Sequence, residues 1–282
     1  MKKILVALLL VVVTTTSVMA SGNVTISLGS DLNESQRTQM KDLLGADENT
    51  KIIEVTNAEE RKYLGNFVDS KIIGTRAISS AYAEILEEGA GIQAEVYNVP
   101  WVTKDMVINS LATAGIKDAK VKVAAPFDVS GTAALAGIIK AFEDATGEVV
   151  SEEKKEIDNE EIAKTGELGQ DIGKDEAAEL VKVVKEAVVK NDIKSQEDIE
   201  KVIADSAQEL NIALTDEQKQ KISELMTKIS SLDLNVEDIK SQLKNISGQL
   251  GKLTENSDEV KSVVQKILDF ITNAFDKLFG NN

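Results

Sequence analysis

The chain has 282 residues, of which 48 are acidic and 32 basic, and it contains neither cysteine nor histidine. Without those two residue types it forms no disulfide, no thiolate or imidazole zinc site and no nucleophile activated by histidine. Its net charge of −16 repels nucleic-acid phosphates, so we expect no nucleic-acid partner. Because the usual zinc ligands are missing, we also expect no metal, and no motif predicts a cofactor.

Residues 1–20 have the pattern of a secretory signal peptide. Two lysines precede the apolar run ILVALLLVVV at positions 4–13, and the stretch ends with small side chains up to Ala20. This run is too short to cross a bilayer, which takes about 20 helical residues. We predict cleavage after Ala20 and a secreted or extracytoplasmic chain with no stable membrane anchor.

Residues 21–147 predict an α/β domain. Strands are expected at 24–28 and 51–56, joined by a helix at 34–44 that Asn33 caps and Gly45 ends. The later elements are a helix at 58–64, strands at 78–86 and 92–99, a helix at 104–114, a strand at 120–124 and a helix at 131–145. The order βαβαββαβα suits helices packed on a mixed sheet.

The strands at 78–86 and 92–99 are interpreted as a hairpin. Their apolar side chains share one face if opposed residues sum to 177, a register that pairs Tyr82 with Glu95. The polar face then presents six side chains: Ser80, Tyr82, Glu84, Gln93, Glu95 and Tyr97.

This polar face is the first candidate site. A binding patch centred on Tyr82 and Tyr97 is the favoured interpretation. In the alternative, Glu84 and Glu95 are diagonal neighbours with Cα atoms about 7–8 Å apart, and they serve as the acid and base of a glycan hydrolase. A solvated strand face is the simplest interpretation of all.

Trp101 is expected to close the core near Thr103, the predicted cap of the helix at 104–114.

The loop at 125–132 is the second candidate site. Ser130, Gly131 and Thr132 open the next helix, where free amides and hydroxyls suit a carboxylate or phosphate. The competing interpretation is that Ser130 caps the helix and the small residues after it allow close packing on the sheet.

Residues 148–174 are interpreted as a flexible acidic linker. The segment contains SEEKKEIDNEE followed by TGELGQDIGK, which is polar and interrupted by glycines. Its acidic clusters around Glu152 and Glu160 lack the spacing of an EF-hand, so we interpret them as solvated surface.

Residues 175–282 predict a helical domain. Apolar stripes occur at helical spacing in three segments, the third of which Thr215 caps with Gln218 three residues later. Beyond residue 235, apolar residues recur every three or four positions up to Leu278, with one break near Asn256 and Ser257. This pattern is typical of coiled-coil-like helices and suits either an antiparallel hairpin or self-association through the C-terminal region.

Four stretches resemble a family of secreted proteins of Gram-positive bacteria. They read ISLGSDLNESQRTQM, GTRAISSAYAEI, TAGIKDAKVKVAAPFDVSGTAALAGIIKAFE and LTDEQKQKISELM. The family is known as domain of unknown function number one thousand and two, or YpuA-like. The resemblance implies an extracytoplasmic protein and supplies no catalytic residues, substrate or cofactor.

The sequence therefore favours a secreted or cell-envelope-associated binding protein that catalyses no reaction. Its partner is expected to be an envelope component or another protein. A carboxylate-dependent glycan hydrolase that uses Glu84 and Glu95 is the alternative.

Overall fold

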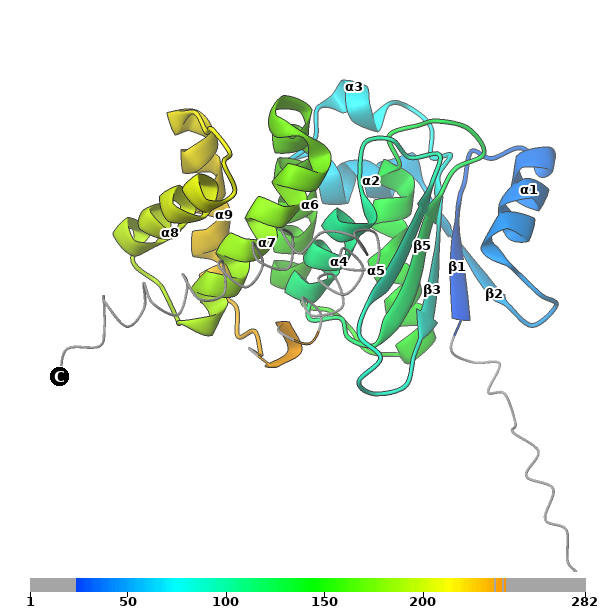
Figure 1. Ribbon diagram of the computed structural model, residues 1–282. Helices are drawn as coiled ribbons and strands as arrows, with labels where there is room; N and C mark the ends of the chain where they lie inside the picture. The colour runs from blue at the N-terminus through cyan, green and yellow to red at the C-terminus, as the bar shows by residue number, and fades with distance from the viewer. Residues whose placement is uncertain (1–23, 236, 240, 242–282) are drawn as a thin grey trace, which may run out of the picture.

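The computed structural model describes residues 24–235, 237–239 and 241 (Figure 1). The predicted signal peptide and its cleavage point, and nearly all of the predicted coiled-coil region, lie outside these residues. Among the described helices, none has both the length and the apolar character needed to span a membrane.

A five-stranded mixed sheet forms the N-terminal part, as predicted. Its strands are β1 (Val24–Gly29), β2 (Lys51–Val55), β3 (Ser80–Ile85), β4 (Gln93–Tyr97) and β5 (Ala119–Ala124). They lie in the order β2-β1-β3-β5-β4, with β1–β2 and β4–β5 parallel and β3 antiparallel to both of its neighbours. The predicted order of strands and helices is confirmed, apart from one added short helix, α3.

Helices cover the two faces of this sheet unequally. They are α1 (Glu34–Leu44), α2 (Asn57–Leu64), α3 (Ser70–Ile73), α4 (Lys104–Thr113) and α5 (Thr132–Thr146). Met40 and Leu44 of α1 pack on Ile26 and Tyr82, whereas α5 packs on the opposite face of β1 and β3. The approach of α5 is close: a Cβ added at Gly137 would lie 2.1 Å from the Ser27 Oγ.

The predicted hairpin is wrong, because β5 lies between β3 and β4. Tyr82 pairs with Lys122 of β5, and Glu95 pairs with the same Lys122 from the other side. Val121 and Val123 continue the apolar face that the alternation predicts. Alternation therefore identified the face of each side chain correctly, but it carries no information about which strand is the neighbour.

The predicted flexible linker is also wrong, because residues 152–172 form α6 (Glu152–Ile172). Ser151 caps this helix, and Asp158, Glu160 and Glu161 are all buried. A buried carboxylate is tolerated when it is paired and hydrogen-bonded. The interpretation as solvated surface holds for Glu152, which is exposed, and fails around Glu160, because lysines from other helices reach the buried carboxylates.

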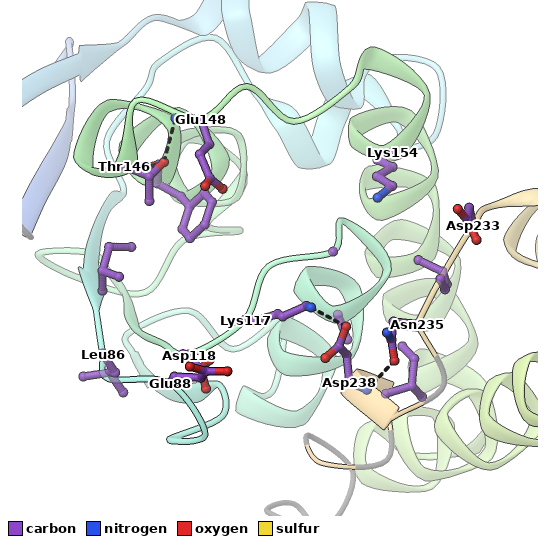
Figure 2. A pocket seen from close by; sticks show the side chains of 16 residues that line it. Leu86, Glu88, Lys117, Asp118, Thr146, Glu148, Lys154, Asp233, Asn235 and Asp238 are labelled. Atoms are coloured by element: carbon purple, nitrogen blue, oxygen red, sulfur yellow. Dashed lines mark hydrogen bonds and ion pairs between the residues drawn. The ribbon is translucent and has the colours of Figure 1, made fainter.

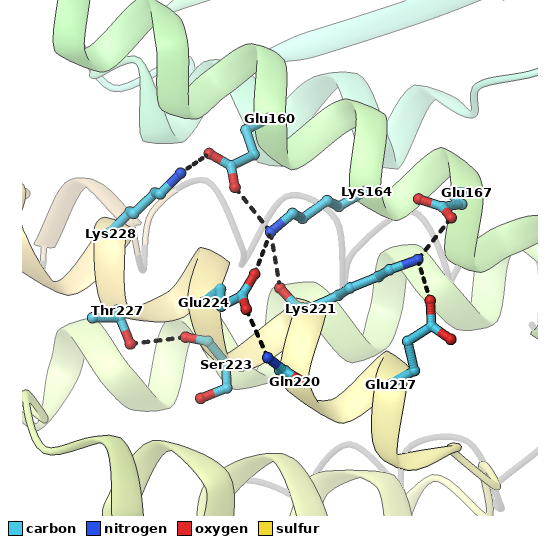
Figure 3. A network of polar contacts seen from close by, with 10 residues as sticks. All are labelled: Glu160, Lys164, Glu167, Glu217, Gln220, Lys221, Ser223, Glu224, Thr227 and Lys228. Carbon is cyan, nitrogen blue, oxygen red and sulfur yellow. Dashed lines mark hydrogen bonds and ion pairs between the residues drawn. The ribbon is translucent and has the colours of Figure 1, made fainter. Parts of the chain in front are cut away.

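Figure 3 shows such pairing between α6 and α9 (Asp216–Ser231). The Glu160 carboxylate accepts from the Lys164 Nζ at 2.9 Å and from the Lys228 Nζ at 2.6 Å. Nearer the surface, the Lys221 Nζ lies 2.9 Å from Glu167 and 3.0 Å from Glu217. Opposite charges thus attach α9 along α6.

The remaining helices are α7 (Lys174–Lys190) and α8 (Gln196–Glu209). The predicted apolar stripes of α7, α8 and α9 meet in one core that includes Leu180, Ile203 and Met226. Thr215 and Gln218 form the predicted capping box. The helical character of this part is thus confirmed for the described residues.

The helical layer, made of helices α6 to α9, packs directly on the α/β part, which comprises residues 24–147. Helix α6 contacts α4, α2 and α5, and α7 contacts α4 (Figure 1). Ile162 and Ala178 belong to the same apolar core as the sheet residues Val121 and Val123. Trp101 packs against this core as predicted, with its ring beside Gly166 of α6.

Candidate functional site

The polar face of the sheet is half covered by α1. Tyr82 is only 8% exposed, and the Lys122 Nζ lies 4.7 Å from its ring centre. The Tyr82 hydroxyl donates to the Glu84 Oε2 at 2.8 Å. Burial and the Glu84 carboxylate raise the pKa of Tyr82, so this tyrosine stays protonated and serves mainly to pack α1 on the sheet.

Tyr97 lies at the open edge of the same face. Its hydroxyl donates to Glu95, whose other oxygen lies 3.1 Å from the Lys120 Nζ. The hydrogen bond from Tyr97 and the ammonium of Lys120 lower the pKa of Glu95. Of the predicted tyrosine pair, only Tyr97 is available to a ligand.

The two glutamates of the hydrolase hypothesis are not neighbours. Strand β5 separates them, with Lys120 opposite Glu84 and Lys122 opposite Glu95. A glycosidase acid needs a raised pKa, whereas that of Glu95 is lowered. The pairing that motivated a carboxylate-dependent hydrolase is therefore absent from this face.

The loop before α5 is occupied by groups of the protein itself. Gly131, not Ser130, is the N-cap of α5. A glycine is required at this position because the backbone adopts φ 85° and a Cβ would lie 2.3 Å from Val99. The Thr132 hydroxyl donates to the buried Glu60 carboxyl at 3.0 Å, and the Ala134 amide donates to Ser79. The geometry therefore does not favour an external anion at residues 130–132.

A large cavity lies where the helical layer meets the α/β part (Figure 2). Its volume is about 630 Å³, within the range of ligand pockets, roughly 300–1,000 Å³. The walls come from the end of β3, the C-terminal ends of α4 and α5, the start of α6 and residues 233–235 with 238–239. Sequence analysis missed this site because its walls come from five separate segments.

The lining of the cavity is predominantly acidic. Among the residues that the structure describes, its carboxylates are Glu88, Asp118, Glu148, Asp233 and Asp238, against the two lysines Lys117 and Lys154. Lys117 pairs with Asp238, and the Asp118 Oδ1 accepts the Gly91 amide at 2.8 Å. Figure 2 shows Lys154 reaching toward the turn that ends α4, where a Cβ on Gly115 would lie 3.1 Å from its Nζ.

Within the described part of the chain, no group of three or more acidic side chains has the geometry to hold a metal ion. The side chains of Glu88, Glu148 and Asp233 are exposed at the cavity. The cavity therefore offers separated negative charges around a volume suited to an organic ligand.

Comparison with known proteins gives two matches. The model of the family described as "Protein of unknown function (DUF1002)" matches residues 28–246. The chain is 40% identical over 274 residues to the "Uncharacterized protein YpuA" of Bacillus subtilis (strain 168), covering 97% of this chain and 94% of that protein. No solved structure matches the chain.

Proposed function

This chain belongs to the DUF1002 family, and from that premise we propose that it is a secreted or cell-envelope-associated binding protein that catalyses no reaction. The cavity between its two parts carries the proposal. The absence of cysteine and histidine removes the commonest nucleophile systems and is consistent with a binding role.

The cavity supports a ligand that carries positive charge. Among the described residues of its lining, five carboxylates outnumber two lysines. The negative ends of the α4 and α5 dipoles face the cavity, against the positive end of α6. The ring of Phe142 also lines the wall and offers an aromatic surface to a cation. An organic polycation fits this lining better than an anion does.

Spermidine is a suitable probe of this binding. We expect it to raise the melting temperature of the full chain, because a ligand that binds only the folded state stabilises that state. A variant that carries Glu148→Lys and Asp233→Lys should lose this rise, since both exposed carboxylates line the cavity.

The matched control carries Asp42→Lys and Glu48→Lys, which change the net charge equally on the surface around α1. It should keep the rise. An equal rise in both variants, or no rise in the wild type, would count against a cation site in the cavity.

The location is tested separately. The pattern of residues 1–20 supports export, so the chain recovered from the culture medium or the cell envelope should begin at Ser21. N-terminal sequencing of that material tests this prediction. Recovery of the chain only from the cytoplasm, with Met1 intact, would contradict export.

A further inference from the structure

A charged cluster lies fully inside the contact between α4, α6 and α7. Lys185 of α7 is 0% exposed and Glu161 of α6 is 1% exposed, with 2.8 Å between the Nζ and the Oε1. The Lys185 ammonium also donates to the Asn109 carbonyl at 2.5 Å and to the Thr113 hydroxyl at 3.1 Å. Because Thr113 donates to the second oxygen of Glu161, this ion pair is satisfied on both sides.

A second carboxyl, Asp158, lies one turn before Glu161 and is not satisfied. It is 4% exposed, and its Oδ1 has no hydrogen-bond partner among the described residues. Burial, the largest cause, and the Glu161 carboxylate raise the pKa of Asp158, whereas the Ser110 hydroxyl and Lys185 lower it, and the net result is a pKa of about 7. Lys185 is already committed to Glu161, so it compensates a second buried negative charge poorly.

The surroundings of Asp158 contain few other charges. Helix α4 presents the Ser110 hydroxyl, α7 presents Lys185, and α6 itself presents Glu161. The other ionisable groups on the helices around α6 interact with other partners. Lys182 and Glu179 of α7 act on Asp105, and Lys228 of α9 pairs with Glu160. Glu143 of α5 pairs with Lys155, and Glu59 of α2 pairs with Lys140. Among the described side chains, an ionised Asp158 thus has no lysine that is not already paired with another carboxylate.

The same two helices form part of the cavity wall. Ala112 of α4 and Lys154 of α6 line the cavity; Thr113 of the buried cluster follows Ala112, and Asp158 lies one helical turn after Lys154. A change in the α4–α6 contact at Asp158 therefore acts directly on two walls of the cavity.

We propose that Asp158 is a proton-controlled clasp between α4 and α6, so that the shape of the cavity depends on whether this carboxyl holds its proton. The inference rests on the binding function proposed above. With the proton in place, the carboxyl is neutral and the helices pack closely. When the proton is lost, hydration of the carboxylate requires water between α4 and α6, and the contact loosens.

The single tryptophan of the chain reports on this contact. Trp101 lies just before α4, and a Cβ on Gly166 of α6 would be 2.9 Å from its ring. We expect the Trp101 fluorescence of the folded full chain to change in one step with a midpoint near pH 7. Asp158→Asn, which imitates the protonated carboxyl, should abolish the step.

Two further variants separate a clasp from a merely structural role. Glu156→Gln removes an exposed carboxyl from the same helix and should leave the step unchanged. Ser110→Ala removes the hydroxyl that favours the ionised form of Asp158 and should move the midpoint to higher pH. A wild-type trace without a step, or a step that survives in Asp158→Asn, would overturn the clasp.

The link to the cavity needs its own measurement. Hydrogen exchange of the amides at residues 112–117 should be faster in the wild type than in Asp158→Asn above neutral pH, and equal in both under acidic conditions. Equal exchange at every pH would overturn the link. Neither measurement requires a ligand, so a failure of spermidine to bind would refute the proposed cation site without affecting this result.

Discussion

The two parts of the molecule bury ionisable groups to very different extents. In the α/β part, Glu60 is the one charged side chain that is buried among residues 24–147. In the helical layer, as far as it is described, six are buried: Lys155, Asp158, Glu160, Glu161, Lys182 and Lys185. The sheet part is therefore held mainly by apolar packing, whereas helices α6, α7 and α9 depend on pairing of charges.

This difference follows from the side chains at each contact. Small residues such as Gly137 bring α5 close to the sheet and leave no room for long polar groups. Between α6 and its neighbours, lysine stems bring their ammonium groups to carboxylates such as Glu160 and Glu161. Substitutions in the α/β part should therefore change stability through packing, and those in the helical layer through the pairing of charges. The following predictions test this contrast.

The largest effect is expected from Lys185→Met. Removing this ammonium leaves the Glu161 carboxylate buried without its charge partner, which should cost about 3–5 kcal/mol of unfolding free energy. Urea unfolding measures the loss. The double variant Lys185→Met with Glu161→Leu should regain most of it, because no unpaired charge remains. A loss that is the same in the single and double variants would contradict the role of pairing.

The next effect is a dependence on pH that originates in the helical layer. The folded-state pKa of Asp158, about 7, lies above its ordinary value of 3.8, so the folded state holds a proton that the unfolded state has released. Unfolding free energy should therefore fall as pH rises between these values, by at most about 4 kcal/mol. Urea unfolding at acidic and at mildly alkaline pH measures the change.

Two variants assign this pH dependence to one part of the molecule. Asp158→Asn should remove most of it. Burial also raises the pKa of Glu60, but Asn57 and Thr132 donate to that carboxyl at 2.6 and 3.0 Å. Glu60→Gln should therefore keep most of the dependence, and the opposite ranking would place the sensitivity in the α/β part.

A third effect should be larger in the α/β part. In Gly137→Ala the new methyl group would meet the Ser27 Oγ at 2.1 Å and Val55 at 3.1 Å, and such overpacking costs about 1–3 kcal/mol. Gly166→Ala in α6 meets the Trp101 ring at 2.9 Å and should cost less. Thermal unfolding of the two variants tests whether the sheet contact is the tighter one.

The smallest effect is expected from Lys221→Ala. This lysine pairs with Glu167 and Glu217, but its side chain is 38% exposed, and exposed ion pairs contribute about 0–1 kcal/mol. Urea unfolding should therefore hardly change. A loss approaching that of Lys185→Met would show that exposed and buried pairs contribute alike, against the contrast drawn above.

The features that sequence patterns predicted correctly are local. Asn33 with Gln36 and Thr215 with Gln218 form the expected capping boxes, because these contacts span three residues. The apolar stripe of α7 is also buried as expected. Such patterns depend only on the helical repeat, and the distant partner of each stripe does not alter them.

The errors concern contacts between distant residues. Alternation along β3 and β4 did not reveal that Lys122, which lies 40 residues after Tyr82, is the strand neighbour. The acidic stretch of α6 looked solvated because Lys185 and Lys228, which neutralise it, occur later in the chain. The cavity was missed for the same reason, since its five walls meet only in the folded molecule.

The strand order also bears on how the sheet is assembled during synthesis. Among the described strands, β4 pairs only with β5. Strand β4 ends at Tyr97, whereas β5 begins at Ala119, beyond α4. A chain that has emerged only as far as residue 118 therefore has β4 with no strand to join, and β3 bonded on one side alone. The edge that β3 exposes at this stage is a template for wrong pairing between chains, so truncations that end before β5 should aggregate more readily than those that include it.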